Sequence, residues 1–113
     1  MRILVVEDEA EVNAVVEEAL DAFGYDVDAV RSAEEALTLL EQIRYDIVIS
    51  DVGLPGMSGT ALAETIARER PRLANRLILL TGRFGETPAS LPVISKPFSV
   101  HDIVQAVEEL VVA

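Results

Sequence analysis

Residues 46–59 read DIVISDVGLPGMSG, a short apolar segment that runs into an acidic residue and then into a turn. The apolar residues of 46–50 predict a short buried strand. Glycine and proline crowd residues 53–59, and the periodic apolar residues that follow predict a helix that ends before Pro71. This stretch therefore predicts a buried strand, a tight connection that begins at Asp51, and a helix.

The alternation of strand and helix continues on both sides of this stretch. Residues 2–6 (RILVV) form a continuous apolar run typical of a strand covered on both faces, whereas residues 26–30 (DVDAV) alternate, which favours a strand nearer the sheet edge. Residues 76–80 (RLILL) and 91–95 predict two more strands. Strands that alternate with helices predict parallel β-α-β units, and therefore an α/β sheet with helices on both faces.

Polar and apolar spacing predicts the helices between these strands. Gly24 stands where the first helix should end. Ser32 with Glu35 predicts a capping box at the second helix, and Ser99 with Asp102 caps the last one. The predicted apolar positions of the first and last helices are Val12, Val15, Val16, Ala19, Leu20 and Phe23, and Ile103, Val104, Val107, Leu110 and Val111.

One interval departs from this alternation. Residues 81–91 read TGRFGETPASL, with two glycines and one proline. A crossover helix needs about eight or more good helix formers, and this interval offers at most one turn. We therefore expect the helix between the fourth and fifth strands to be missing or vestigial.

Composition and charge limit the class of protein. The chain has 113 residues, of which 50% are hydrophobic, and nine Lys plus Arg against twenty Asp plus Glu give a formal net charge of -11. This charge argues against direct binding to nucleic acid or an anionic membrane. The absence of cysteine excludes disulfides and zinc-thiolate sites, and the apolar runs are too short to span a bilayer. We expect one soluble cytoplasmic domain over residues 1–113, with a monomer favoured.

Five chemically competent side chains stand at the predicted C-terminal ends of strands, where open parallel sheets gather their functional groups. They are Glu7, Asp8, Asp51, Thr81 and Lys96. Two carboxylates about 4 Å apart repel by roughly 4 kcal/mol at an effective dielectric constant of 20, so such a cluster takes up protons or holds a cation. Mg²⁺ suits carboxylate oxygens, and lysine and threonine suit phosphoryl oxygens. The set therefore predicts a site for a phosphorylated carboxylate, with Asp51 as the nucleophile.

Four segments resemble the receiver domain of two-component response regulators. They are ILVVEDE at residues 3–9, ISDVGLPGMSG at 49–59, LILLTG at 77–82 and VISKPF at 93–98. Each segment alone is a weak signal, but the four in order are specific, and the resemblance covers essentially the whole chain. It implies a flavodoxin-like, doubly wound, five-stranded parallel sheet in the order 2-1-3-4-5.

The resemblance also implies a role for each acidic residue of the set. Asp51 would accept a phosphoryl group from a sensor histidine kinase or a histidine phosphotransfer protein. Asp8, Asp51 and the backbone carbonyl of Gly53 would bind Mg²⁺, and Glu7, which replaces the more usual aspartate, would assist through water. Partner kinases of receivers commonly dock on the first helix, whose glutamate-rich face is otherwise a solvated surface.

The remaining two residues would act on the phosphoryl group itself. By the same resemblance, Thr81 and Lys96 would bind phosphoryl oxygens, and the Lys96–Pro97 peptide bond would be cis. The domain would catalyse its own phosphorylation and slow dephosphorylation without being a conventional turnover enzyme.

Two features differ from the usual receiver pattern. Val93 occupies the position where many receivers carry a tyrosine or phenylalanine that reports phosphorylation, and the shortened interval belongs to a face commonly used for output. We therefore expect either that ordering of residues 82–90 reports phosphorylation, or that the domain is a phosphate sink or relay. With Gly53 leaving one flank of Asp51 open, Arg83 is predicted to control the lifetime of the aspartyl phosphate.

Two other functions are compatible with this fold class. A pseudo-receiver would bind proteins without phosphotransfer, and the intact set of Asp8, Asp51, Thr81 and Lys96 argues against it. A small phosphatase or nucleotide-binding enzyme is disfavoured because no glycine-rich phosphate loop follows the first strand. His101, the single histidine, is expected to be a solvated surface residue.

Overall fold

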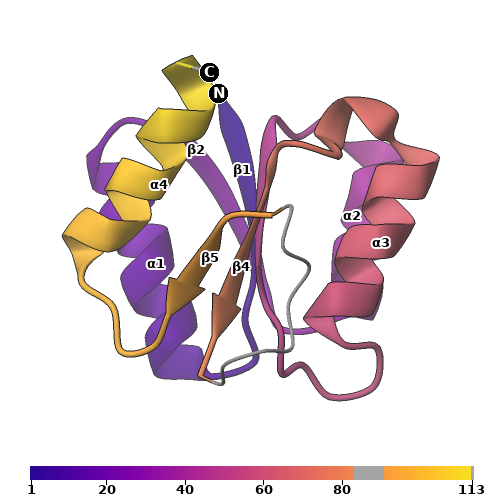
Figure 1. The fold of residues 1–113 in the computed structure, drawn as a ribbon, viewed down its shortest axis with the longest axis horizontal. Helices are drawn as coiled ribbons and strands as arrows, with labels where there is room; N and C mark the ends of the chain where they lie inside the picture. Colours follow the sequence, from indigo (N-terminus) through magenta and orange to yellow (C-terminus); the bar gives the residue numbers. More distant parts are fainter. Residues whose placement is uncertain (83–90, 113) are drawn as a thin grey trace.

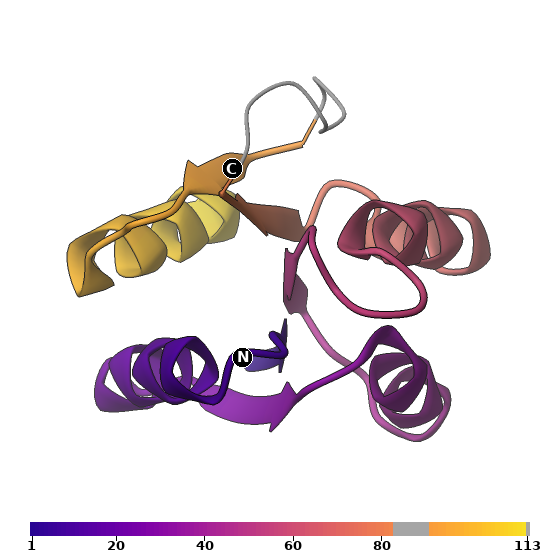
Figure 2. The same ribbon diagram turned by 90° about the horizontal axis from the view of Figure 1, so that it is seen from below.

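The computed structural model describes residues 1–82 and 91–112 and contains a five-stranded parallel sheet in the order β2-β1-β3-β4-β5. Helices α1 and α4 cover one face of the sheet, and α2 and α3 cover the other (Figures 1 and 2). The predicted α/β class, strand order and two-sided helix cover are confirmed. The strands are β1 (Arg2–Val6), β2 (Asp26–Val30), β3 (Ile47–Asp51), β4 (Leu77–Thr81) and β5 (Val93–Ser95), and the helices are α1 (Ala10–Ala22), α2 (Ala33–Gln42), α3 (Gly59–Glu69) and α4 (Val100–Val112).

The continuous apolar runs of the central strands supply two separate cores. Successive side chains of a strand point to opposite faces, so β1, β3 and β4 each contribute to both cores. Between the sheet and α2 and α3 lie Leu4, Val6, Val48, Leu77 and Leu79; between the sheet and α1 and α4 lie Ile3, Val5, Ile47, Ile49, Ile78 and Leu80. The half-buried strand β2 lies at the sheet edge, as its alternating sequence predicted.

Three strands have boundaries that differ from the sequence prediction by one or two residues. Strands β3 and β4 each begin and end one residue later than predicted, and β5 is shortened to three residues. Asp51 still pairs with Leu80 of β4, and the carbonyl of Thr81 accepts a 2.8 Å hydrogen bond from the backbone N–H of Lys96. Asp51 and Thr81 are therefore the last residues of their strands, held by the sheet's own hydrogen bonds.

The predicted apolar faces of two helices were partly wrong. Val15, Phe23 and Val111 are exposed, although the remaining apolar positions are buried or packed against the core. The buried side of α1 is centred on Val16 and Leu20; Val15 lies about 100° away from Val16 around the helix, and Phe23 follows the last helical residue. Three- and four-residue spacing therefore predicted a wider apolar stripe than the sheet covers.

Both predicted helix caps are confirmed. The Ser32 hydroxyl accepts a hydrogen bond from the backbone N–H of Glu35 (3.1 Å), and the Glu35 carboxylate accepts one from the N–H of Arg31 (3.0 Å). At α4, Ser99 and Asp102 exchange reciprocal side-chain to backbone hydrogen bonds of 3.2 and 2.9 Å. These caps fix where the chain re-enters a helix after β2 and β5.

The Lys96–Pro97 peptide bond is cis, as the resemblance implied. Three predictions concern the interval between β4 and β5: the missing helix, the ordering of residues 82–90 and the role of Arg83. They fall mainly on residues 83–90 and so lie outside the described residues. No helix within the described ranges is long and apolar enough to cross a membrane.

Candidate functional site

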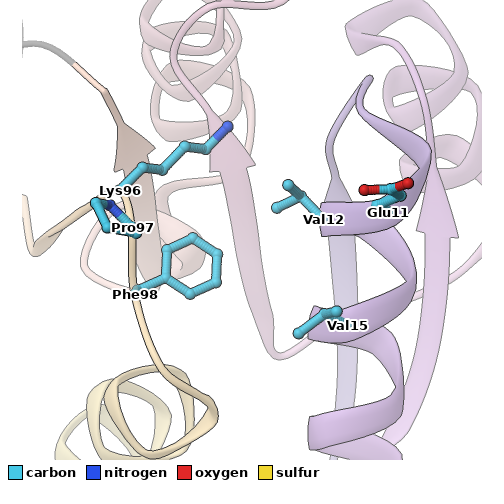
Figure 3. Close-up of a pocket in the computed structure, with 6 residues that line it drawn as sticks. All are labelled: Glu11, Val12, Val15, Lys96, Pro97 and Phe98. Carbon is cyan, nitrogen blue, oxygen red and sulfur yellow. The ribbon is translucent and has the colours of Figure 1, made fainter.

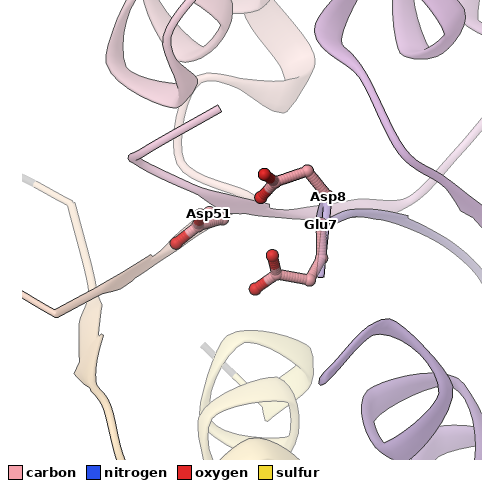
Figure 4. Close-up of side chains that lie close together, drawn as sticks. All are labelled: Glu7, Asp8 and Asp51. Atoms are coloured by element: carbon pink, nitrogen blue, oxygen red, sulfur yellow. The ribbon is translucent and has the colours of Figure 1, made fainter. Parts of the chain in front are cut away.

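Three carboxylates meet at the C-terminal edge of the sheet. Glu7 and Asp8 follow β1 directly, Asp51 ends β3, and these two strands are hydrogen-bonded neighbours. The side chains of Glu7 and Asp8 extend toward Asp51 (Figure 4), and one oxygen from each of the three lies within 4.8 Å of the others. Adjacent strand ends thus produce the acidic cluster that the sequence predicted.

Lys96 supplies the cation of this cluster. It is the chain's single lysine, and its ammonium lies 2.8 Å from Glu7 Oε1, 3.2 Å from Asp51 Oδ1 and 3.4 Å from Glu9 Oε1. The proximity to Asp51 was predicted, whereas the ion pairs with Glu7 and Glu9 were not. One ammonium therefore balances part of the charge of several carboxylates.

Burial and charge act in opposite directions on the titration of these groups. Glu7 is fully buried and Asp51 is 6% exposed, and burial raises the pKa of both carboxyls although Lys96 opposes the shift. Asp8 and Glu9 raise the pKa of Asp51 further through repulsion. Burial lowers the pKa of Lys96, but its contacts with Glu7 and Asp51 outweigh this and hold the pKa above its ordinary value. The cluster thus retains an excess of negative charge that a cation would relieve.

Asn13 on α1 fixes the backbone next to the cluster, a role that the sequence did not predict. Its side-chain amide donates hydrogen bonds to the carbonyls of Glu7 (3.1 Å) and Val30 (2.9 Å) and so joins the ends of β1 and β2. The available signal was its position, because residues 13, 16 and 20 share one helical face and that face is buried. A polar residue on a buried stripe indicates a satisfied internal contact.

Gly59 is a second positioning residue, which the sequence predicted only as part of a turn. It is the first residue of α3, and its backbone N–H donates a 3.0 Å hydrogen bond to the carbonyl of Val52. A Cβ at this position would overlap the backbone carbonyl of Asp51. Glycine therefore allows the start of α3 to pack directly against the end of β3, which holds Asp51 at the edge of the sheet.

A cavity of about 700 Å³ opens beside the acidic cluster. Asp51, Gly53, Thr81 and Lys96 line it, together with residues of the β3–α3 connection. Thr81 is 7% exposed, and a Cβ at Gly53 would lie in ordinary contact, 3.6 Å from Asp51 Oδ2. Asp51, Thr81 and Lys96 of the predicted set thus line a space large enough for a phosphoryl group, whereas Glu7 and Asp8 are not among its lining residues.

An apolar hollow of about 490 Å³ lies next to this cavity. Val12 and Val15 of α1 face Pro97 and Phe98 across it (Figure 3), and Lys96 forms part of its wall. The exposure of Val15, which contradicted the predicted apolar stripe, places an apolar side chain on this surface.

The donor set fits a hard divalent cation. Carboxylate oxygens are the ligands that Mg²⁺ prefers, and one or two of them with waters usually suffice. Asp8 and Asp51 would hold the ion, with Glu7 and the carbonyl of Gly53 as the further predicted contributors. The grouping of three carboxylate oxygens and the raised pKa of Asp51 are the observations that support this fit.

Comparison with known proteins gives one consistent family. A family model described as the response regulator receiver domain matches residues 3–108. The two-component response regulator PhoP of Pseudomonas aeruginosa is 32% identical over 108 residues, which cover 91% of this chain and 48% of PhoP. The response regulator receiver protein CpdR of Brucella abortus is 27% identical over 119 residues, covering 99% of this chain and 98% of CpdR. The chain therefore spans about half the length of PhoP and nearly all of CpdR.

Solved structures show the same similarity. The response regulator TrrA of Thermotoga maritima, crystallised in complex with Mg²⁺-BeF, is 31% identical with a TM-score of 0.86 over 96% of this chain and 97% of TrrA. TrrA in complex with the histidine kinase ThkA is 32% identical with a TM-score of 0.84 and the same coverage.

Proposed function

The chain belongs to the family of response regulator receiver domains, and from this premise we propose that it accepts a phosphoryl group on Asp51 in a Mg²⁺-dependent reaction. The observation that carries the proposal is the setting of Asp51. Its carboxylate is almost completely buried and lies 3.2 Å from the Lys96 ammonium. It lines a cavity that Thr81 also lines.

The proposed reaction needs from the protein a positioned nucleophile and groups that stabilise charge, rather than further covalent chemistry. An Asp51 carboxylate oxygen attacks the phosphorus of a phosphohistidine, a P–O bond forms, the P–N bond breaks, and its electron pair stays on the imidazole nitrogen. Lys96 and Thr81 bind the phosphoryl oxygens as charge redistributes. In dephosphorylation, water attacks the same phosphorus, inorganic phosphate leaves and the carboxylate is regenerated. The domain thus serves both reactions without being a conventional turnover enzyme.

Mg²⁺ would be held by Asp8, Asp51 and the carbonyl of Gly53, with Glu7 acting through water. When bound, the ion would supply charge neutralisation for the oxygens of the transferring group. The chain's own contribution is to hold Asp51 by the packing of Gly59 and to keep the Glu7 carboxylate in place through the backbone N–H of Glu9 (3.0 Å).

The proposed phosphodonor is a sensor histidine kinase or a histidine phosphotransfer protein. The apolar hollow between α1 and residues 97–98 supports a docking surface there, because it adjoins Lys96 and presents Val15 and Phe98 beside the charged face of α1. The structure of TrrA with ThkA supports this class of partner. We place the domain, residues 1–113, in the cytoplasm, where such kinases present their phosphohistidine.

The proposed output is atypical. Val93 is exposed on β5 and carries no aromatic ring that could report the state of Thr81. The domain would therefore act as a stand-alone regulator, a phosphate sink or relay, or a module of a larger protein, all without the usual aromatic switch.

A small phosphodonor tests the proposed function directly. Incubation with acetyl phosphate and Mg²⁺, followed by intact-protein mass spectrometry, should show one added phosphoryl group that is absent in Asp51→Ala and absent when Mg²⁺ is chelated. Glu9→Gln, which changes an exposed carboxylate of the same neighbourhood, should still be phosphorylated. No adduct on the folded wild-type protein would instead indicate a pseudo-receiver, and turnover of the donor without an adduct at Asp51 would indicate a hydrolytic enzyme.

A further inference from the structure

Three arginine side chains line a small pocket at the edge of the sheet opposite Asp51. The C-terminal ends of α2 and α3 lie at this edge, beside the N-terminal ends of the strands (Figure 1). The pocket has a volume of about 330 Å³, and Arg44, Arg70 and Arg72 line it with residues 40–43. This site shares no residue with the cavity around Asp51.

The charge of this pocket is opposite to that of the chain. The sequence has nine basic residues against twenty acidic ones, and three of those nine line this one pocket. Among the lining residues, Glu41 alone is acidic. The pocket therefore carries a local positive excess in a protein whose net charge is strongly negative.

The three guanidinium groups are poorly satisfied within the protein. In the part of the chain that the structure describes, the side chains of Arg44 and Arg72 form no hydrogen bond or ion pair. Arg70 Nη1 is buried without a hydrogen-bond partner, and the Glu69 carboxylate lies 3.7 Å from it. A buried N–H donor without a partner is costly, so Arg70 Nη1 would be stabilised by a ligand that accepts its hydrogen bond.

Attraction to the helix ends accounts for only part of this arrangement. Arginine is favoured near helix C-termini, where backbone carbonyls lack partners. Arg76 shows how this chain uses that interaction, because its guanidinium donates a 2.7 Å hydrogen bond to the carbonyl of Leu110 in the last turn of α4. Arg44, Arg70 and Arg72 make no such side-chain contact among the described residues, so their donors are available to a ligand.

We propose that the Arg44–Arg70–Arg72 pocket binds a small phosphate-bearing molecule. The guanidinium fork matches two oxygens of a phosphate group, and three such groups match a ligand with several negative charges. The pocket is too small for a folded partner and falls within the size range of small-molecule sites. Since the net charge of -11 repels anions at long range, binding would depend on these short-range contacts.

Residue-resolved NMR titration with pyrophosphate tests the proposal. The ¹⁵N-labelled full chain would be titrated at constant ionic strength and without Mg²⁺, and citrate would serve as a carboxylate of comparable charge. Saturable shifts should centre on the Nε–Hε signals of Arg44, Arg70 and Arg72. Arg70→Gln and Arg72→Gln should each weaken pyrophosphate binding about tenfold or more.

Matched variants separate a built site from general charge. Arg68→Gln removes an exposed arginine of α3 that does not line the pocket, and it should leave the affinity within about twofold. Asp51→Ala should bind pyrophosphate as the wild type does, which keeps this test independent of the proposed phosphoryl acceptance. Shifts confined to the surroundings of Lys96, equal weakening by Arg68→Gln, or equally tight citrate binding would each overturn the proposal. Because Arg72 is exposed, Arg72→Gln is expected to fold even if Arg70→Gln does not.

Discussion

The two edges of the sheet carry opposite local charge. At the C-terminal edge, one ammonium lies within 3.4 Å of three carboxylates, and Glu7 and Asp51 are buried. At the N-terminal edge, three guanidiniums line one pocket, and two of them are exposed. The net charge of -11 is a sum over the whole chain and does not show how charge is distributed between the two edges. Each edge instead has an imbalance that a ligand of the opposite sign would correct.

Because only the acidic edge is buried, the two charge imbalances should affect the free energy of unfolding unequally. Charges that are removed from water repel strongly and depend on their partners, whereas exposed charges are screened by solvent and salt. We therefore expect substitutions at the acidic edge to change the free energy of unfolding far more than substitutions in the arginine pocket. Four experiments, ordered by expected effect, test this difference.

Lys96→Gln should have the largest effect. The buried Glu7 carboxylate would lose the ammonium 2.8 Å away, and removal of one partner from a buried pair costs about 3 kcal/mol or more. Urea unfolding at neutral pH without Mg²⁺ measures this. Glu9→Gln is the matched control; because Glu9 is exposed, it should change stability by less than about 0.5 kcal/mol. Equal stability of Lys96→Gln and wild type would show that the acidic edge does not depend on Lys96.

Added Mg²⁺ should stabilise the protein by a comparable amount. A ligand that binds only the folded state at a hundredfold excess over its dissociation constant raises the free energy of unfolding by about 2.7 kcal/mol. Thermal unfolding in MgCl₂ and in EDTA at matched ionic strength measures the effect, and Asp8→Asn should diminish it. A melting temperature that does not respond to millimolar Mg²⁺ would contradict the proposed metal site.

Arg76→Gln should have a smaller effect, and it compares two kinds of arginine at the basic edge. Loss of the hydrogen bond to the Leu110 carbonyl should cost about 1.5 kcal/mol. Arg72→Gln removes an arginine without such a bond and should change stability by less than about 0.5 kcal/mol. Chemical unfolding of both variants in phosphate-free buffer gives the comparison; equal losses would mean that the pocket arginines also stabilise the helix ends.

Acidification should produce the smallest of the four effects, because Lys96 opposes the rise in pKa that burial causes at its carboxylate partners. The folded-state pKa values of Glu7 and Asp51 are raised above their ordinary values of 4.5 and 3.8. The folded state therefore binds protons more tightly, and stability should rise as the pH falls from 7 toward those values. Urea unfolding in EDTA across this range should show a shallower rise in Asp51→Asn than in wild type. Identical profiles for the two proteins would argue against a raised pKa at Asp51.

The repeating pattern of strand and helix was predictable because each element depends on local sequence. The continuous apolar run of residues 2–6 predicted a central strand, and the alternation of residues 26–30 predicted the edge strand. Strands β3 and β4 end one residue later than predicted, at Asp51 and Thr81, because hydrogen bonds to the neighbouring strand decide where pairing stops. Helix spacing could not show how far the sheet extends beneath α1, so Val15 was wrongly assigned to the core.

The members of the acidic site were predictable because parallel strands place their C-terminal ends together. Asn13 and Gly59 could not be assigned in the same way. The role of Asn13 depends on the distance between the ends of β1 and β2, and that of Gly59 depends on how closely α3 approaches Asp51. Both are properties of packing between segments that are separate in the sequence.

The sequence alone determined the alternating elements, the family resemblance and the identity of the residues at the strand ends, because these depend on short-range spacing. Only the tertiary structure decided that Lys96 pairs with Glu7 as well as Asp51, and that Arg44 lies beside Arg70 and Arg72. The physical reason is that charges interact through space over a few ångströms, and that distance is set by the packing of helices on the sheet rather than by separation along the chain.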